Sequence, residues 1–473
     1  MLLTNIIYFK IKINVFLFLL ITKATVALFL RMLEINYPLN FKIYTLLQVM
    51  EHLSKELEFL NELFSHVQSR GLMLLEANKD ESNRIINYNG KPLINFLTNS
   101  YLALENDPRV KKAAIEGIDK YGLFSSVSRT YLSFDHYLEF EDKLEKIFGL
   151  PTLIINNVSI GHFAYLPLIV GQNDAIITDQ FVHRSVKMAV QYLKGGGIYS
   201  EVVRHNQMND LEKRIKVLSE TYDKVWYFTD SVFSMQGGVA PFEDLEVLLN
   251  KYDKFNLYVD DAHGMSWIGE NGKGYCFHKI AHHDKMYVIS SLNKGFGATN
   301  AVMVCPNQKT KDLIHKLGLP IIFSSPTMHA GITAGSALAD IHLSQEIYER
   351  QAMLNERIKF FKQKIRDFDI PMLSPNSHTP IGYIVLGSIE GTLQFGEIMQ
   401  DKGFIMSVSS LPSVPIKHSG YRVSISLHQS MKDIENLCDN IAETMLGLEK
   451  KRVFNREIAF RNIRQSERKS ELA

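Results

Sequence analysis

Residues 286–305, MYVISSLNKGFGATNAVMVC, place one lysine between two short apolar runs. Lys294 lies in a turn of small residues and glycines after the run 286–290, and a second apolar run, 301–305, follows. Continuous apolar runs of this length are typical of strands that are buried on both faces of a sheet. A lysine in a turn is by itself usually an exposed surface residue, so the residues around Lys294 must show whether it has a function. At the end of a buried strand, its amine could hold a ligand.

The same pattern extends through the preceding part of the chain, where short apolar runs alternate with segments of helical periodicity. Further strands are expected at 152–156, 174–179, 224–230 and 256–263, and helices at 107–122 and 183–197. Strands separated by helices predict an α/β fold, with a mostly parallel sheet covered by helices.

The pattern changes near residue 340. Residues 335–368 could form one long helix or two helices joined end to end, and the shorter strands and helices that follow predict a smaller α+β domain with an antiparallel sheet. The tail is charged and is expected to be a solvated helix or disordered. The predicted divisions are an N-terminal extension, a helix-containing segment, a large domain, a small domain and the tail, at 1–49, 50–107, 108–340, 341–455 and 456–473.

The first 49 residues contain a nearly continuous apolar stretch, 13–33, interrupted by Lys23. One interpretation is a membrane anchor or uncleaved signal, because about 20 apolar residues span a bilayer. The other is that translation begins at Met50, where an amphipathic helix is predicted at once. Lys23 near the middle of the stretch weakens the spanning interpretation.

Composition excludes several classes of function. The chain has 473 residues and a formal net charge of +1, which offers no electrostatic basis for binding nucleic acid. Its three cysteines, Cys276, Cys305 and Cys438, lie far apart and form no CxxC pair. This spacing excludes a disulfide scaffold and a cysteine zinc site, predicts no metal, and favours a reducing, cytoplasmic location.

Polar residues gather where the predicted strands end, which is where open α/β sheets bind ligands. Pyridoxal phosphate (PLP) would use such a set, because its aldehyde reacts with a lysine, its ring nitrogen pairs with a carboxylate and its phosphate accepts from hydroxyls and backbone amides. Asp260 and His263 could instead be a structural pair, and His183 a residue at a helix start. The strand-end residues are Asp230, Ser234, Asp260, His263, Ser291 and Lys294, and His183 follows the strand 174–179.

Three motifs resemble the α-oxoamine synthases, PLP enzymes of fold type I. They are YVDDAHGMSWIGENGKG (258–274), NKGFG (293–297) and DSVFSMQGGVAPFEDL (230–245). The resemblance extends from about residue 95 to residue 435. It implies a large PLP-binding domain, a smaller C-terminal domain and a homodimer with shared active sites.

The resemblance also implies a role for each matching residue. Lys294 would carry the cofactor, Asp260 would pair with its ring nitrogen, His183 would stack on the ring, and His263 and Ser234 would contact the ring oxygen. Ser291 would bind the phosphate, which Ser324 or Ser325 would reach from the partner subunit. Arg422 would bind the carboxylate of the amino acid, beside Asn99.

At two positions the sequence differs from the family's motifs, so the residues that take over the family's roles there are not decided by the resemblance. The family's S-G-F-x-A-N is NVSIGH here (157–162), so that Ser159 or His162 could substitute in seating the cofactor. A family histidine after the G-S-R motif is displaced, and His136 and Tyr137 both lie near its expected place.

The implied reaction condenses an amino acid with an acyl-CoA thioester, usually with decarboxylation, to give an α-amino ketone and free CoA. Two alternatives are another fold type I reaction, transamination or a lyase step, and a non-catalytic subunit that pairs with an active homologue. Retention of Lys294 argues against the latter.

Overall fold

The computed structural model describes residues 55, 57–80, 82–411 and 413–471. The apolar N-terminal extension lies outside this range, and so do both interpretations of it. Residues 57–69 are helical, as the segment after Met50 predicts. Within the described residues, none of the helices combines the length and the apolar character that crossing a membrane requires.

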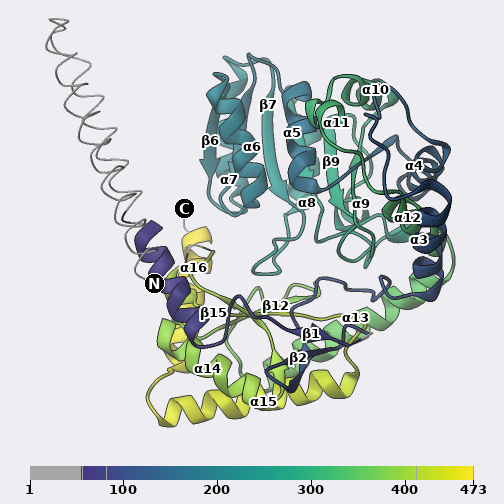
Figure 1. The fold of residues 1–473 in the computed structure, drawn as a ribbon. Coiled ribbons are helices and arrows are strands. Elements are labelled where there is room, and N and C mark those ends of the chain that lie inside the picture. Colours follow the sequence, from purple (N-terminus) through teal and green to yellow (C-terminus); the bar gives the residue numbers. More distant parts are fainter. Residues whose placement is uncertain (1–54, 56, 81, 412, 472–473) are drawn as a thin grey trace, which may run out of the picture. The chain divides into compact units, whose positions relative to one another are not determined.

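A seven-stranded sheet forms the centre of the larger part of the fold (Figure 1), in the order β4-β10-β9-β8-β7-β5-β6. Its ladders are parallel except those that β10 makes with β4 and β9, which confirms the predicted mostly parallel sheet. The strands are β4 (Thr152–Ile155), β5 (Ala175–Asp179), β6 (Tyr199–Val203), β7 (Val225–Asp230), β8 (Phe255–Asp260), β9 (Met286–Ser291) and β10 (Ala301–Val304).

Successive side chains of these strands enter two different apolar cores, which explains their continuous apolar runs. In β7, Tyr227 belongs to one core, and Trp226 and Phe228 belong to the other. The second core includes α5 (Val158–Ile169) and α6 (Arg184–Gly195), and the first includes α3 (Pro108–Tyr121), α4 (Asp135–Phe148), α7 (Met208–Ser219), α8 (Phe242–Lys251) and α12 (His329–His342). Three short helices, α9 (Tyr275–Lys279), α10 (Gln308–Leu317) and α11 (Leu319–Phe323), complete this part.

The C-terminal part has an antiparallel sheet in the order β11-β12-β15-β14, as predicted for an α+β domain. A second small sheet joins β1, β2 and β3 to β13, so a segment before the large sheet pairs with one that follows it. The strands are β1 (Asn78–Lys79), β2 (Ile85–Tyr88), β3 (Lys91–Asn95), β11 (Met372–Leu373), β12 (Ile381–Val385), β13 (Phe404–Ile405), β14 (Ser407–Ser409) and β15 (Gly420–Ser424), and the helices are α14 (Ile389–Asp401) and α15 (Met431–Lys450).

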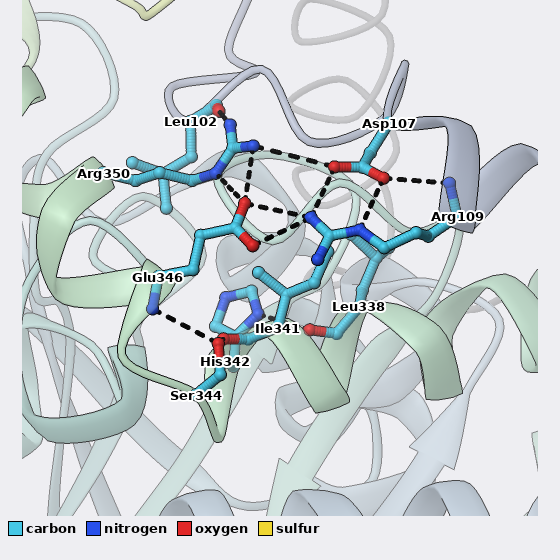
Figure 2. Close-up of polar contacts among 9 residues, drawn as sticks. All are labelled: Leu102, Asp107, Arg109, Leu338, Ile341, His342, Ser344, Glu346 and Arg350. Atoms are coloured by element: carbon cyan, nitrogen blue, oxygen red, sulfur yellow. Dashed lines mark hydrogen bonds and ion pairs between the residues drawn. The ribbon is translucent and has the colours of Figure 1, made fainter.

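The segment 335–368 contains two helices, the second of the alternatives that the sequence left open. α12 ends at His342, and α13 (Glu346–Asp367) begins after a break of three residues. At this break, Arg109 and Arg350 share Glu346, and both lie near Asp107 (Figure 2). The network ties the start of α13 to the residues before α3.

The charged tail differs in part from its prediction. It forms α16 (Arg456–Glu471), which is helical, but Ala459 and Ile463 are buried. Apolar residues four apart lie on one face of a helix, so this face packs against the protein instead of being solvated.

Candidate active site

A cavity of about 170 Å³ lies where β7, β8 and β9 end. Of the predicted site residues, Ser159, His183, Asp260, His263, Ser291 and Lys294 line it. The other lining residues are Asn157, Val158, Ser185, Asp230, Val232, Ala262 and Asn293.

Asp260 and Asp230 stand side by side, because β7 and β8 are parallel and these two residues are register partners. The backbone N–H of Ala262 donates to Asp260 Oδ1 over 3.0 Å, and His162 Nε2 lies 3.3 Å from Oδ2. Both carboxylate oxygens are therefore held.

Asp261 points away from the cavity. Its carboxylate accepts from the Ser231 hydroxyl and, over 3.4 Å, from the backbone N–H of Cys276. It fills space that a side chain at Gly264 or Gly274 would need, since a Cβ there would lie 1.9 or 2.1 Å from its oxygens. The glycines of this motif thus make room for a structural carboxyl group.

The three neighbouring carboxyl groups differ in charge. Burial raises the pKa of Asp230 well above its usual value, and the neighbouring charge of Asp260 adds to this. Burial likewise raises the pKa of Asp261 to about 8. Burial alone would raise the pKa of Asp260 too, but the hydrogen bond from His162 and the charge of Lys294 lower it. Near neutral pH the negative charge is therefore held by Asp260.

Lys294 brings an amine to this carboxylate. Desolvation lowers the pKa of Lys294 to about 8, against the opposing attraction of Asp260. Among the described residues, the amine has no hydrogen-bond or ion-pair partner. A lysine with a lowered pKa is partly neutral near physiological pH, and a neutral amine is the form that reacts as a nucleophile or accepts a proton.

His263 is held beside the cavity by aromatic partners. Tyr101 Oη lies 2.7 Å from His263 Nδ1, and the indole N–H of Trp267 donates to the backbone carbonyl of His263 over 2.7 Å. Burial, with the nearby charges of Lys294 and Arg422, lowers the pKa of His263 well below its usual value. The imidazole is therefore neutral near pH 7.

The start of α5 forms another wall of the cavity. Asn157 caps this helix, since its side chain accepts from the backbone N–H of Ile160, and Val158 and Ser159 form its first turn. The hydroxyl of Ser291 faces the same cavity and donates to Asn293 Oδ1. A helix N-terminus with nearby hydroxyl and amide groups suits an anionic group such as a phosphate.

Arg422 and Asn99 contact each other beside this cavity, without being among its lining residues. An Nη2–H of Arg422 donates to Asn99 Oδ1 and, over 3.2 Å, to Ser424 Oγ. Arg422 Nε is buried and has no partner in the described part of the chain. The segment of Asn99 is fixed further along, where Leu102 accepts from Arg350 over 3.1 Å (Figure 2).

Besides Arg422 and Asn99, four predicted residues do not line the cavity. Ser234 lies two residues beyond Val232, in a turn closed by a hydrogen bond from Gly237 to Phe233. Ser324 and Ser325 are exposed residues after α11, and the carbonyl of Ser325 accepts from the Asn156 side chain over 2.8 Å.

The fourth, His136, lies in a separate buried cluster. Its Nε2 is 2.8 Å from His329 Nδ1, and the ring of Tyr121 stacks on it at 4.1 Å between centroids. Tyr137, the other residue near the displaced family histidine, donates to the carbonyl of Thr327. The structure thus places His136 against aromatic rings and not at the cavity.

Sequence reasoning had assigned no role to Asn157, Val158, Ser185, Val232, Ala262 or Asn293. All six are within two residues of a predicted site residue. Proximity to a strand end was the signal that could have found them.

These groups suit PLP. A lysine amine with a lowered pKa for the aldehyde, a charged buried carboxylate for the ring nitrogen and a helix N-terminus for the phosphate all border one cavity. No group of three or more histidine, cysteine or acidic side chains arranged for a metal ion occurs among the described residues.

Comparison with known proteins gives one consistent result. Residues 91–441 match the family described as aminotransferase class I and II. The chain is 30% identical to the 8-amino-7-oxononanoate synthase of Alkaliphilus oremlandii over 369 residues, which are 76% of this chain and 90% of that protein.

Two solved structures share the fold. The serine palmitoyltransferase of Sphingomonas wittichii superposes with a TM-score of 0.76 at 20% identity, covering 85% of this chain and 99% of that one. A serine palmitoyltransferase structure with a PLP internal aldimine also has a TM-score of 0.76 at 20% identity, covering 84% of this chain and 99% of that one.

Proposed function

This chain belongs to the aminotransferase class I and II family and is an α-oxoamine synthase, and from this premise we propose the roles of its residues in the reaction. It is a PLP-dependent acyltransferase that condenses an amino acid with an acyl thioester, in the manner of the 8-amino-7-oxononanoate synthases it resembles. The observation that carries the assignment is that the Lys294 amine, with its lowered pKa, and the charged Asp260 carboxylate line the same cavity.

Each side of the cavity would hold one part of the cofactor. Lys294 would bind its aldehyde carbon, Asp260 its ring nitrogen and His263 its ring oxygen, to which Ser234 would reach from the turn beyond Val232. His183 would cover one face of the ring. Ser291 and the first turn of α5, with Ser159, would bind its phosphate. When bound, the cofactor supplies a cationic conjugated ring that withdraws electrons from the α-carbon of the amino acid.

The chain's own residues bind the substrate and move its proton. Arg422, with Asn99 beside it, binds the amino acid carboxylate through a guanidinium whose Nε is without a partner in the described chain. The amine of Lys294, once released, accepts the α-proton. Asp260 stays negative during this step, which keeps the ring nitrogen protonated.

The second subunit of a homodimer completes the site in this proposal. Exposed apolar side chains support an interface around α11, since Phe323 and Met328 are 81% and 50% exposed in the single chain. Ser324 and Ser325 lie between them and reach the phosphate of the partner's cofactor. A cytoplasmic location is supported by the three cysteines, which are all free.

A substrate screen tests this function. Purified protein with PLP is incubated with each amino acid and with acyl-CoAs of several chain lengths, and free CoA thiol and amino ketone mass are measured. We expect CoA release that depends on one amino acid. Formation of a keto acid without CoA release would instead identify an aminotransferase.

A further inference from the structure

A buried histidine connects two residues of the cavity wall. His162 is fully buried in α5 and lies behind Asp260. Its Nε2 is 3.1 Å from Ser185 Oγ and 3.3 Å from Asp260 Oδ2, while its Nδ1 is 2.8 Å from Tyr258 Oη. Ser185 Oγ lies 2.7 Å from His183 Nδ1, so the chain of contacts continues to the ring of His183.

The donor and acceptor of each hydrogen bond can be assigned from the two ends of this chain of contacts, where one group can act in only one way. At one end, the backbone N–H of Ser185 can only donate, and it donates to His183 Nδ1 over 3.3 Å. His183 Nδ1 is therefore an acceptor, and the Ser185 hydroxyl, which contacts the same nitrogen, must also donate to it. Ser185 Oγ is then left to accept from His162 Nε2–H.

The other end gives the same direction. His162 Nε2 faces the carboxylate of Asp260, an acceptor, so a ring that carries one proton carries it on Nε2. Nδ1 then accepts from the hydroxyl of Tyr258, whose pKa is raised well above its usual value by burial. The bonds run from Tyr258 to His162, from His162 to Asp260 and Ser185, and from Ser185 to His183.

We propose that Tyr258, His162 and Ser185 form a directional relay that fixes both groups flanking the cofactor ring, the Asp260 carboxylate and the His183 imidazole. The relay holds Asp260 Oδ2 in place and, together with the Ser185 backbone N–H, confines the proton of His183 to Nε2, the nitrogen without a partner in the described structure. The effect of the relay on the cofactor rests on the proposed function. The hydrogen bonds of the relay themselves can be tested on protein without cofactor. All three are positioning residues.

The sequence departs from its family where this relay begins. The resemblance places asparagine at position 162, the last residue of S-G-F-x-A-N, and this chain has histidine. The two ring nitrogens of histidine contact Tyr258 on one side and both Ser185 and Asp260 on the other. Of the two candidates left open by the motif, Ser159 lines the cavity, and His162 acts from behind it.

Histidine ring NMR on protein without cofactor tests the relay directly. The protein is labelled at both ring nitrogens of histidine, and the signals of His183 are assigned with His183→Gln. We expect Nε2–H and unprotonated Nδ1 in the wild type, and a partial loss of this preference in Ser185→Ala and His162→Asn, where the longer 3.3 Å bond from the Ser185 backbone N–H remains but the 2.7 Å bond from the hydroxyl is lost or no longer directed. Tyr258→Phe, which removes only the hydroxyl, should alter the His162 signals most.

A second measurement uses binding and turnover. His162→Asn should weaken PLP binding to the apoprotein by roughly 10-fold, the order expected for losing a hydrogen bond to a charged group. It should lower kcat and leave the KM for the amino acid nearly unchanged, because the relay touches no substrate. His342→Asn is the matched control, since His342 is also fully buried and, among the described residues, its ring nitrogens contact Leu338 and Ser266 and no residue of the relay.

The outcomes separate the relay from the proposed function. Nδ1–H on His183 in the wild type, or unchanged His183 signals in His162→Asn, would overturn the relay. Signals altered equally by His342→Asn would also overturn it, because they would report general destabilisation. Wild-type protein that shows the expected tautomer but binds no PLP would refute the proposed function and leave the relay standing.

Discussion

Asp230, Asp260 and Asp261 illustrate how position sets the charge of a residue. All three are buried, and burial favours the neutral form of each. Only Asp260 has imidazole and ammonium groups close enough to reverse this preference. In the sequence, only the resemblance of the motif 258–274 to its family selects Asp260 over the adjacent Asp261; in the structure, only Asp260 lines the cavity.

Asp260→Asn keeps the shape of the side chain and removes its charge. We expect exchange of the amino acid α-proton to slow by roughly 100-fold or more, because the ring nitrogen loses the anion that keeps it protonated. The rate is measured by NMR in deuterated buffer. Asp261→Asn is the control and should keep a rate near the wild type, since that carboxyl group is protonated at pH 7. Normal exchange in Asp260→Asn would show that Asp260 is not the ring partner.

The lowered pKa of Lys294 predicts how cofactor capture depends on pH. The neutral amine reacts with the aldehyde, and its fraction rises with pH through the pKa. The rate at which apoprotein combines with PLP should therefore rise with a midpoint near pH 8, the pKa of Lys294, and not near the 10.5 of an ordinary lysine. Stopped-flow absorbance measures this rate. Lys294→Ala should show no such phase, and a midpoint above pH 10 would contradict the prediction.

At the scale of elements, the sequence predicted the central strands well because both of their faces are buried. Runs such as 224–230 contain apolar residues at successive positions, a local signal. β6 was not predicted: its residues, YSEVV, are mixed in polarity, and only Val203 is buried. Two-residue strands such as β13 depend on a partner far along the chain, in this case β3, which no local pattern reveals.

The site residues likewise divide into those that a local sequence pattern predicts and those whose contacts lie far along the chain. Residues directly after strands, such as Asp260 and Lys294, could be predicted because the fold brings strand ends together. The contacts of His162 could not, because Ser185 and Tyr258 lie 23 and 96 residues away on other elements. The position of His136 was also not predictable, since its partner His329 is 193 residues away.

One buried cation on α13 has no role in the site. Lys362 is 2% exposed, and its amine donates to the carbonyl of Ile381 in β12 over 3.2 Å. Burial, with the charge of Arg366, lowers the pKa of Lys362 to about 7. A group whose pKa is depressed on folding costs stability wherever the unfolded chain binds the proton more tightly.

This cost predicts a stabilising substitution. Between pH 7 and 10.5 the unfolded chain binds more protons at this lysine than the folded one, so the wild type should gain stability as pH rises. Lys362→Met removes the titrating group and should raise the free energy of unfolding by a few kcal/mol, on the order of 3, at pH 6.5 and by much less at pH 9.5. Urea unfolding at the two pH values measures this.

Lys359→Met is the control on the same helix, because Lys359 is exposed. Its substitution should change stability little at either pH. A Lys362→Met protein that is less stable than the wild type at pH 6.5 would show that the bond to Ile381 outweighs the cost of burying the amine.

At the scale of the whole molecule, the proposed dimer makes one active site from two chains. Lys294 would come from one subunit, and Ser324 and Ser325 from the other. The structure of the single chain shows these serines exposed and outside the cavity lining, so the assignment to the partner needs an experiment that distinguishes the subunits.

Complementation between two inactive variants makes this distinction. One variant is Lys294→Ala, and the other carries Ser324→Ala with Ser325→Ala. In a mixed dimer, the lysine of the second subunit meets the intact serines of the first, and that site has every group it needs. Unfolding and refolding an equal mixture should thus restore roughly a quarter of wild-type turnover, since half of the dimers are mixed and each has one complete site.

Two controls complete the test. Each variant refolded alone should remain inactive, and sedimentation should show that both are dimers, so that recovery cannot come from restored folding. If the serines act within their own subunit, the mixed dimer has no complete site, because the subunit with Lys294 lacks its serines. An equal mixture without recovered turnover would therefore place the serines in the same subunit as the lysine they serve. A serine variant that is active when refolded alone would instead place the serines outside the site.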